Sequence, residues 1–484
     1  MTCSDSRRNF IKAAAASTVV MTAGCASITE SARTGERVDV VVLGAGLGGL
    51  HAASLLEQAG ARVTVLEADT RVGGRIRTLN DLPGNPETGG TQIGGAYKRI
   101  VDTARRLGLQ LIPNGRSPLL ADDSMVYFIN GIRMTRASWI ASPTNPFAEM
   151  HRGTPPDRLL GRLIGRSPLA DITAWREPTA ATSVIDNVSA LDHLRANGLS
   201  AEALRLLEVN NSYGDALADT SLLNLYYTQT NIAEIMKTPG PTLGVAGGNQ
   251  RLPEAMANAL RTPVQLGKRV AALRLDAGGV EVTCGDGSRH RGRFVICALP
   301  LPAMRGIDFS PKLPQLLALA IQQLPYARVT QLHLEVKRQF WKEEGASPYV
   351  WSDGPIKRVF PSDPAGTGHP QTLTGWINGT ETAHWDALTD ADAESLALAE
   401  MRRIFPASAG ALRLAKRVSW HSTPLAGGAW ANWAPGQITR FARIVGEPIG
   451  RLHFAGEHCA HGLRGMEGAM ESAERAAPQI LAMK

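Results

Sequence analysis

The sequence lacks the residue patterns that mark several kinds of catalytic or structural centre. It contains no C-x-x-C pair and no H-x-x-x-H pair, so neither a dithiol redox site nor a zinc site with that spacing is indicated. Cysteine is scarce, and the spacing of its five positions suggests no disulfide framework: Cys3, Cys25, Cys284, Cys297 and Cys459. We therefore expect no metal site and no dithiol chemistry.

Dense basic runs are also absent, although the formal net charge is +7 and the sequence pI is about 9.3. The lysines and arginines are dispersed and no basic run is accompanied by aromatic residues, so we expect no nucleic-acid partner. A diffuse basic surface more often affects only solubility. With 484 residues, of which 44% are hydrophobic, the chain is globular in composition and long enough for two packed domains.

Residues 1–34 are expected to be an export signal and linker rather than part of the fold. Arg7 and Arg8 form a twin-arginine signature with Phe10, and the apolar run at 13–24 is too short to span a bilayer as a helix. A frayed amphipathic N-terminus is the alternative. The residues ending at Cys25 also match a lipoprotein cleavage box, so lipidation there would tether the protein to a membrane. The signal predicts a periplasmic protein.

The first region of regular structure predicts a dinucleotide-binding βαβ unit. An apolar strand at 38–43 is followed at once by a glycine loop, then by a helical pattern at 50–59 and a second apolar strand at 62–67. A glycine loop alone is weak evidence, but its place between a strand and a helix is the context that the dinucleotide fingerprint requires.

Each glycine of this loop has a separate expected role. Gly44 permits the tight turn, Gly46 lets the backbone approach the pyrophosphate, and Gly49 lets the helix pack closely on the strand. The helix N-terminus then receives the anion. Glu67 ends the second strand, where its carboxylate can accept hydrogen bonds from a ribose diol and disfavours a 2′-phosphate. On this evidence NAD and FAD both remain candidates.

The sequence Arg71-Val72-Gly73-Gly74-Arg75 resembles the flavin-containing amine oxidase family, which includes monoamine, polyamine and L-amino acid oxidases. The resemblance implies FAD, with Arg75 at the pyrophosphate, a role suited to its permanent charge. The glycine-rich segment 89–95 is similar to the family's segment beside the isoalloxazine ring, where small residues allow close approach. A twin-arginine signal suits such an enzyme because this route carries proteins already folded around a cofactor.

The C-terminal region resembles the family's flavin signature. Residues 452–457 form an expected strand that ends in Gly456 and Glu457, and residues 465–477 open a helix. The resemblance implies that Glu457 binds the ribityl chain. It also implies that the helix N-terminus at Met466 faces the flavin pyrimidine, where negative charge accumulates on reduction.

The fold class that the resemblance implies is α/β. We expect a two-domain FAD-binding Rossmann-type fold of the glutathione reductase kind with an interleaved α+β substrate domain. Residues 247–252 resemble the point where the chain re-enters the FAD domain, and the backbone of Val270 is expected to meet the adenine. The expected segments are 35–113, 246–300 and 418–484 for FAD binding, 114–245 for a helical substrate region and 301–417 for a substrate sheet.

Residues near the C-terminus are expected to line the substrate side of the flavin. Covalent monoamine oxidases carry a cysteine where this chain has Ala429, so we expect non-covalent FAD. Trp430 falls where the family places one wall of an aromatic cage, and Gly465 falls where the opposite wall would stand, which leaves room for a bulkier substrate. Cys459 is interpreted as a small buried residue.

The main departure from the family pattern is at Gln331. Most members carry a lysine there, and that lysine holds a water at flavin N5. A glutamine can hold water through its amide but brings no charge and shuttles no proton. Two consequences follow as alternatives: a periplasmic electron carrier replaces oxygen as acceptor, or the substrate is not an ordinary amine. If the alignment slips by two residues, His333 is the candidate instead, although a satisfied strand histidine is favoured.

The leading hypothesis is an exported FAD enzyme that oxidises a C–N bond of a small-molecule amine by hydride transfer to flavin N5, after which the imine hydrolyses. One alternative is desaturation of a C–C bond, and a third class is a non-catalytic FAD protein. L-amino acid oxidases place an arginine where this chain has Ile93, which disfavours amino acids unless Arg464 substitutes. The acceptor, oxygen or another carrier, and the oligomeric state stay open.

Overall fold

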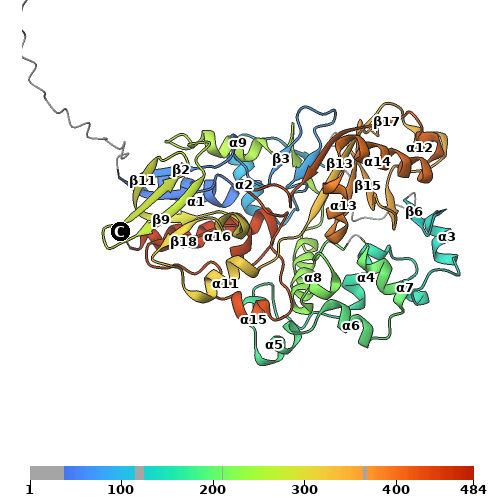
Figure 1. Cartoon of the computed structure of the whole chain (residues 1–484), viewed down its shortest axis with the longest axis horizontal. Helices are drawn as coiled ribbons and strands as arrows, with labels where there is room; N and C mark the ends of the chain where they lie inside the picture. Colours follow the sequence, from blue (N-terminus) through green and yellow to red (C-terminus); the bar gives the residue numbers. More distant parts are fainter. Residues whose placement is uncertain (1–36, 115–124, 210, 364–367, 484) are drawn as a thin grey trace, which may run out of the picture.

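The computed structural model describes residues 37–114, 125–209, 211–363 and 368–483 (Figure 1). The predicted export signal and Cys25 therefore lie outside the described residues. The described chain forms two lobes, each built around a seven-stranded sheet. Among the described helices, none combines the length and the apolar composition needed to cross a membrane.

The first sheet is assembled from three separate parts of the sequence. Its central strand β1 (Val38–Leu43) runs parallel to β2 (Val63–Leu66) and to β11 (Arg289–Cys297), and β18 (Leu452–Phe454) also pairs with β11. An antiparallel ribbon extends the other side through β10 and β9, and β12 then pairs in parallel with β9: β10 (Val280–Cys284), β9 (Val270–Leu275) and β12 (Asp308–Ser310).

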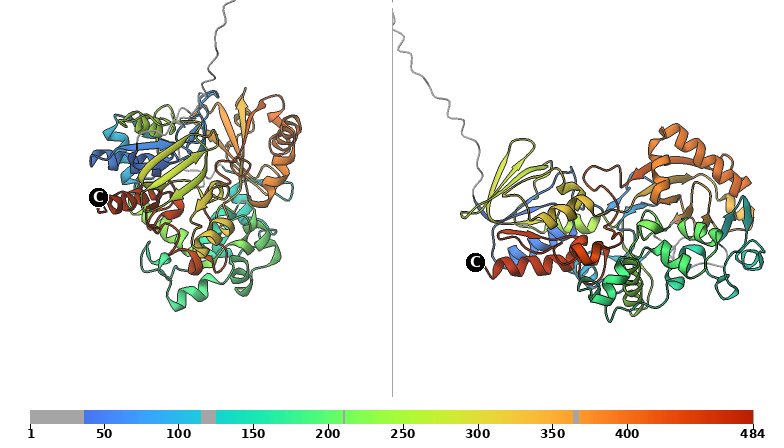
Figure 2. Two further views of the ribbon diagram at one scale, coloured as in Figure 1. Left: turned by 60° about the vertical axis from the view of Figure 1, so that its left-hand side comes forward. Right: turned by 60° about the horizontal axis from the view of Figure 1, so that its bottom comes forward.

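Both faces of β1 are buried, which explains its continuous apolar sequence. Val40 and Val42 pack in one hydrophobic cluster, while Val41 and Leu43 pack in the cluster on the opposite face. The first cluster is formed largely with helices α1 (Leu47–Gln58) and α16 (Gly465–Leu481), which lie side by side although they come from opposite ends of the chain (Figure 2).

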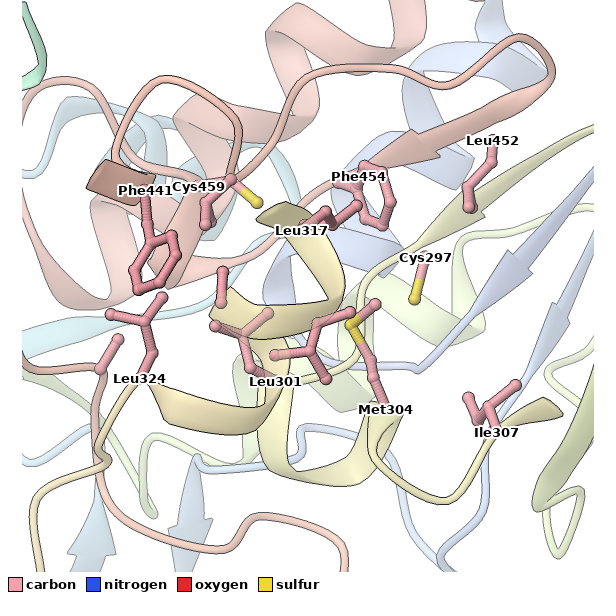
Figure 3. Packing of buried hydrophobic residues seen from close by; sticks show 14 of the residues in the cluster. Cys297, Leu301, Met304, Ile307, Leu317, Leu324, Phe441, Leu452, Phe454 and Cys459 are labelled. Carbon is pink, nitrogen blue, oxygen red and sulfur yellow. The ribbon is translucent and has the colours of Figure 1, made fainter. Parts of the chain in front are cut away.

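The opposite cluster contains three of the cysteines, Cys284, Cys297 and Cys459. Figure 3 shows Cys297 and Cys459 among the side chains of helices α10 (Leu301–Met304) and α11 (Gln315–Gln323) and of β18. Both thiols are fully buried, and burial raises the pKa of each to about 12. They are therefore core residues, as interpreted for Cys459, and the described cysteines form no disulfide.

The second sheet joins segments that the sequence analysis assigned to two different regions. Its strand order is β17-β13-β16-β15-β14-β6-β7, with these bounds: β17 (Leu412–Ser419), β13 (Val329–Val336), β16 (Thr372–Asn378), β15 (Arg358–Ser362), β14 (Val350–Ser352), β6 (Val126–Ile129) and β7 (Ile132–Met134). The helical region 114–245 thus also supplies two strands. These are too short to show a periodic pattern in the sequence.

Helices cover both faces of the second sheet (Figure 1). On one face lie α12 (Phe340–Glu343), α13 (Thr382–Ala387) and α14 (Asp390–Ile404); on the other lie α4 (Pro156–Leu163), α6 (Ala190–Ala196), α7 (Ala201–Glu208) and α8 (Leu222–Met236). Successive residues of β6 alternate between the two clusters, since Tyr127 packs with the second group of helices and Phe128 with the first.

Smaller elements complete the described chain. They are β3 (Arg77–Thr78), β4 (Glu87–Gly89), β5 (Leu111–Pro113), β8 (Leu243–Val245), α2 (Lys98–Arg106), α3 (Arg136–Ala141), α5 (Ala180–Asp186), α9 (Arg251–Asn258) and α15 (Gln437–Phe441). Single 3₁₀ turns lie at Glu149–His151, Ala174–Arg176, Leu217–Asp219, Gly379–Glu381, Pro406–Ser408 and Glu457–Cys459.

The α/β fold class is confirmed, and the longer predicted strands lie where the patterns placed them. One predicted boundary differs. The switch to the substrate sheet was expected at residue 301, but β12 at Asp308–Ser310 still pairs with β9 of the first sheet, and the chain enters the second sheet only with β13. The apolar run at 264–266 forms only an isolated bridge between Gln265 and Leu66.

Candidate active site

A cavity of about 470 Å³ is lined by residues of the first sheet, by its connecting loops and by residues of the second lobe such as Trp376. All the predicted cofactor-binding residues except Gly49 line it: Gly44, Gly46, Glu67, Arg75, Val270, Gly456, Glu457 and Met466. Two of the three predicted substrate-side residues, Trp430 and Gly465, line it as well. The structure therefore brings together residues from both ends of the sequence.

The glycine loop at the end of β1 has a geometry that lets a ligand approach its backbone closely. Gly44 has φ +95°, a conformation that residues with a side chain rarely adopt. A Cβ added to Gly46 would meet no protein atom within 4 Å, so the backbone here faces open space in the cavity. At Gly49 a Cβ would lie 2.0 Å from the Gly44 carbonyl oxygen, so this glycine serves helix packing behind the cavity.

Helix α1 presents an uncapped N-terminus beside this loop. Its N-cap is Gly46, which has no side chain to accept hydrogen bonds, and the first turn holds no acidic residue. The first N–H groups of a helix have no intrahelical acceptor, so they can donate to an anion such as a pyrophosphate. The donor set and the open space beside Gly46 both fit the dinucleotide of FAD.

Glu67 fixes the glycine loop as well as lining the cavity. Its Oε2 atom accepts a hydrogen bond from Ala45 N at 2.7 Å, and its Oε1 atom accepts from Asp69 N at 2.8 Å. Burial raises the pKa of Glu67 despite these two bonds. Each carboxylate oxygen has a second lone pair, so the ribose contact expected of Glu67 fits this arrangement and stays a prediction.

Arg75 and Glu457 form an ion pair at the cavity wall. Nη1 of Arg75 donates to Glu457 Oε2 at 3.1 Å and to the Ala429 carbonyl at 3.0 Å. The backbone N–H of Ala431 donates to the same carboxylate oxygen at 3.2 Å, and the Arg75 guanidinium lies over the ring of Tyr326. Arg75 is predicted to contact the pyrophosphate and Glu457 the ribityl chain. Because the two side chains are adjacent, these predicted contacts lie next to each other in one cavity.

Helix α16 begins at Gly465, which has φ +69°, and leads Met466 into the cavity lining. Its N-cap, Arg464, makes no side-chain cap. The acidic residue of the first turn, Glu467, is turned away and accepts from the backbone N–H groups of Arg99 and Ile100. The positive end of the helix dipole therefore faces the cavity, as the predicted flavin contact requires.

Three tryptophans line the cavity: Trp376, Trp420 and Trp430. Trp420 Nε1 donates to the Thr88 carbonyl oxygen at 2.7 Å. Trp430 lies next to Ala429, which also lines the cavity and carries no sulfur, consistent with the expected non-covalent cofactor. A Cβ added to Gly465 would meet no atom within 4 Å, so the space predicted beside it is open.

Gln331 lies one layer behind the cavity lining. It is fully buried in β13, its Nε2 atom donates to the Thr88 carbonyl at 3.0 Å, and its Oε1 atom lies 3.2 Å from Nε2 of His333. Both ends of the amide are therefore engaged within the protein. The predicted role of holding water at flavin N5 is not supported by this placement, because Gln331 is absent from the described lining.

His333 is the buried partner of Gln331. Its Nδ1 atom lies 3.3 Å from Thr374 Oγ1, and burial, reinforced by the charges of Lys416 and Arg77, lowers its pKa to about 3. A neutral ring that donates from Nε2 to Gln331 Oε1 and accepts at Nδ1 from Thr374 satisfies every group. His333 is thus a satisfied strand histidine, as favoured from the sequence.

Neither Ile93, the position at which L-amino acid oxidases carry an arginine, nor Arg464, the suggested substitute for that arginine, is among the residues that line the cavity. Ile93 is fully buried and its backbone pairs with Leu243. Arg464 donates to Thr228 Oγ1 at 2.6 Å and to the Ala431 carbonyl at 3.1 Å, and it is not among the described lining residues. The suggestion that Arg464 substitutes for the missing arginine is therefore not supported.

Sequence reasoning missed Gln92 and Tyr97, which both line the cavity. Gln92 belongs to the glycine-rich segment that had been matched to the flavin, yet its side chain was not singled out. Tyr97 precedes helix α2 and carries no motif that would have marked it. Among the described residues, no group of three His, Cys, Asp or Glu side chains is placed to hold a metal ion.

Comparison with known proteins covers nearly the whole chain. The family model for flavin containing amine oxidoreductases matches residues 47–481. An L-amino-acid oxidase from Siganus canaliculatus is 28% identical over 463 residues, which cover 91% of this chain and 85% of that protein. Flavin-containing amine oxidase B from Homo sapiens is 27% identical over 468 residues, which cover 92% of this chain and 86% of that protein.

Solved structures share the fold at lower identity. A putrescine oxidase variant superposes with a TM-score of 0.76 at 23% identity, covering 93% of this chain and 99% of that chain. Cyclohexylamine oxidase from Brevibacterium oxydans superposes with a TM-score of 0.76 at 24% identity, covering 92% and 99%. These similarities extend over nearly the whole chain, so the fold with its two lobes is shared with these two enzymes.

Proposed function

The chain belongs to the flavin-containing amine oxidoreductase family, whose members bind FAD and oxidise amines, and we propose that it does so by hydride transfer after export from the cytoplasm. The observation that carries this proposal is the cavity itself. The N-termini of α1 and α16 both face it, and Arg75 and Glu457 form an ion pair in its wall.

FAD bound in this cavity would supply the redox chemistry, namely acceptance of a hydride from the carbon that bears a neutral amine. The amine nitrogen then loses a proton, and the resulting imine is hydrolysed by water. The residues of this chain bind and orient. The helix N-terminus at Met466 favours negative charge on the flavin pyrimidine, and the three tryptophans exclude water from the reacting carbon.

Anaerobic mixing of the holoenzyme with a panel of amines tests this proposal. We expect the yellow absorbance of the flavin to bleach with at least one amine, with the matching aldehyde or ketone as product. Bleaching only by unsaturated or polycyclic carbon substrates would replace the proposal with C–C desaturation, which the open space at Gly465 and the placement of Gln331 away from the cavity favour as the alternative. No bleaching by either class would indicate a non-catalytic FAD protein.

The electron acceptor is a separate part of the proposal. Gln331 supplies neither a charge nor a free amide to the cavity, so we propose that oxygen reacts slowly and that a periplasmic carrier takes the electrons. Hydrogen peroxide yield measured against reduction of a cytochrome or dye distinguishes the two acceptors. Peroxide formation at the full turnover rate would show an ordinary oxidase.

Export rests on the sequence outside the described residues. Replacement of Arg7 and Arg8 by lysine is expected to retain the protein in the cytoplasm, because the twin-arginine route reads both arginines. Fractionation of expressing cells measures this. Replacement of Cys25 by serine separates a lipid tether from a soluble exported form, since only the tethered protein would shift from the membrane fraction. Periplasmic recovery of the double lysine variant would contradict the proposed route.

A further inference from the structure

Two asparagine side chains hold the segment 88–92, which lines the cavity described above. Asn249 Nδ2 donates to the Gly90 carbonyl oxygen at 2.6 Å, and Asn114 Nδ2 donates to the Thr91 carbonyl oxygen at 2.7 Å. Neither asparagine is among the described residues that line this cavity. Both therefore contact the segment from behind its exposed backbone.

The two asparagines line a second cavity, of about 530 Å³, which is also bordered by Glu87, the residue directly before the segment. Asn249 is fixed there at two further points. Its Oδ1 atom accepts from Val245 N at 2.8 Å, and its own backbone N–H donates to Glu87 Oε1 at 2.6 Å. The amide donors thus reach the segment from the side of the second cavity.

The planar trans peptide converts these contacts into an orientation of the N–H groups. The C=O and N–H of one peptide plane point in opposite directions. An amide that holds the Gly90 carbonyl therefore turns the N–H of Thr91 away from the second cavity, and the amide on the Thr91 carbonyl does the same for the N–H of Gln92. Neither N–H donates to an atom of the described residues. Two adjacent donors thus face the first cavity.

Gln331 holds the start of the same segment. Its Nε2 atom donates to the Thr88 carbonyl oxygen at 3.0 Å, and this oxygen also accepts from Trp420 Nε1 at 2.7 Å. Its Oε1 atom is engaged by His333, so the amide cannot turn over without losing both contacts. Gln331 therefore acts on the first cavity through the backbone, although its side chain does not line it.

The segment is also closely packed at its two glycines. A Cβ added to Gly89 would lie 2.1 Å from the Arg75 carbonyl oxygen and 2.8 Å from the ring of Trp420. A Cβ added to Gly90, which has φ +66°, would lie 2.9 Å from the side chain of Ile76. A small shift of the segment would create similar contacts, so its position is narrowly defined.

From this geometry we propose that Asn114, Asn249 and Gln331 are positioning residues for bound FAD. They hold the segment 88–92 so that its two uncommitted N–H groups donate to acceptor atoms of the cofactor. A buried N–H group needs an acceptor, and a flavin ring carries carbonyl oxygens and ring nitrogens that can serve. The proposal concerns the binding of FAD and does not depend on the oxidation of an amine, so the bleaching experiment above tests a different claim.

Hydrogen exchange followed by mass spectrometry, with and without FAD, tests the orientation directly. In the wild type we expect FAD to slow exchange of the Thr91 and Gln92 N–H groups at least about tenfold, because the cofactor then accepts from them. Asn114→Leu should remove most of this protection at Gln92, since the peptide plane before it loses its holder. Exchange that FAD leaves unchanged in the wild type would overturn the proposal.

Loss of one amide should also change the surroundings of the bound flavin. Asn114→Leu, Asn249→Leu and Gln331→Met each remove a donor without adding charge. We expect each to weaken FAD binding about five- to tenfold and to alter the visible circular dichroism spectrum of the bound flavin. Asn114→Asp keeps the size of the side chain and loses the donor at neutral pH, so its effect should be at least as large.

Gln229→Met is the matched control. Gln229 Nε2 also donates to two backbone carbonyls, those of Gly161 and Gly165, at 2.7 and 2.8 Å, but it lies in α8 outside the described lining. Its replacement should lower stability without altering the flavin spectrum or the protection that FAD gives. An equal spectral change in Gln229→Met would show that the effect is general loosening of the fold and would contradict the proposal.

The Asn114 variants decide the outcome if a variant of a more deeply buried amide does not fold. Asn114 is only partly buried, whereas Asn249 and Gln331 are almost fully buried. Wild-type FAD affinity and an unaltered flavin spectrum in both Asn114→Leu and Asn114→Asp would overturn the proposal.

Discussion

Nη1 of Arg75 lies 3.1 Å from Oε2 of Glu457, an ion pair between residues 382 positions apart in the sequence. The Arg75 side chain is 22% exposed and that of Glu457 is 9% exposed, so the pair is largely withdrawn from solvent. It ties the loop after β2 to the loop after β18, and Nη1 also holds the carbonyl of Ala429. The pair therefore stabilises the cavity wall before any cofactor contact is counted.

Removal of Arg75 is expected to affect both stability and FAD binding. Arg75→Ala leaves a buried carboxylate without its partner, which costs about 3 kcal/mol. If at least half of this free energy is lost from FAD binding, the affinity for FAD drops roughly 10- to 100-fold. Fluorescence titration with FAD and thermal unfolding measure the two effects. The control is Arg443→Ala, which breaks an exposed pair with Glu177 and should change neither quantity.

Gly46 and Gly49 of the glycine loop predict opposite outcomes on mutation to alanine. Gly46→Ala adds a methyl group into open space, so the protein should keep its stability without FAD within about 0.5 kcal/mol but lose at least about tenfold in FAD affinity. Gly49→Ala places its Cβ against the Gly44 carbonyl and should cost more than about 3 kcal/mol in the protein itself.

Thermal unfolding with and without added FAD distinguishes these cases. The stabilisation that a ligand gives depends on its concentration relative to its dissociation constant. Gly46→Ala should match the wild type without FAD and show a reduced rise when FAD is added. If Gly46→Ala proves as unstable as Gly49→Ala in the absence of FAD, the division between a cofactor role and a packing role is wrong.

Local sequence patterns predicted those strands and turns whose conformation is determined by residues close to them in the sequence. The buried strand Val38–Leu43 and the turn at Gly44 follow from residues within one βαβ unit, and they are confirmed. The strand Val329–Val336 spans eight residues, which is long enough for a strand pattern to show in the sequence. Three-residue strands such as Asp308–Ser310 are too short for a pattern, and their sheet membership depends on partners elsewhere.

The candidate site was predictable only where a motif marked a residue. Arg75 and Glu457 were identified by separate motifs, but nothing local indicates that they pair. The position of Gln331 in β13 was predicted, whereas its commitment to the Thr88 carbonyl and to His333 depends on contacts between distant segments. Tyr97 has no motif at all, so only the fold places it in the cavity.

The cofactor is expected to dissociate on denaturation. The position at which covalent monoamine oxidases attach their flavin is Ala429, and the nearby thiol of Cys459 is fully buried with its pKa raised to about 12. A buried thiol of this kind is a poor nucleophile. After acid precipitation all yellow absorbance should therefore appear in the supernatant, and Cys459→Ala should give the same result. Flavin retained in the pellet of the wild type alone would identify Cys459 as an attachment site.

Buried His333 predicts a loss of stability in mild acid. Its folded pKa is about 3 and the ordinary value is 6.5, so the unfolded chain binds the proton more readily. The free energy of unfolding should be constant above about pH 6.5 and fall as the pH decreases toward 3, with a slope of at most about 1.4 kcal/mol per pH unit from this group.

His333→Asn is expected to reduce the decrease in the free energy of unfolding at low pH, because asparagine does not titrate and can still form hydrogen bonds. His458 will maintain part of the slope, since burial also lowers its pKa to about 3. The matched control is His384→Asn, the same substitution at an exposed histidine of α13. Urea unfolding at intervals between pH 4 and 8 measures the slopes.

An identical pH dependence in wild type and His333→Asn would show that His333 is protonated in the folded protein. The neutral hydrogen-bond chain from Thr374 through His333 and Gln331 to Thr88 would then be wrong.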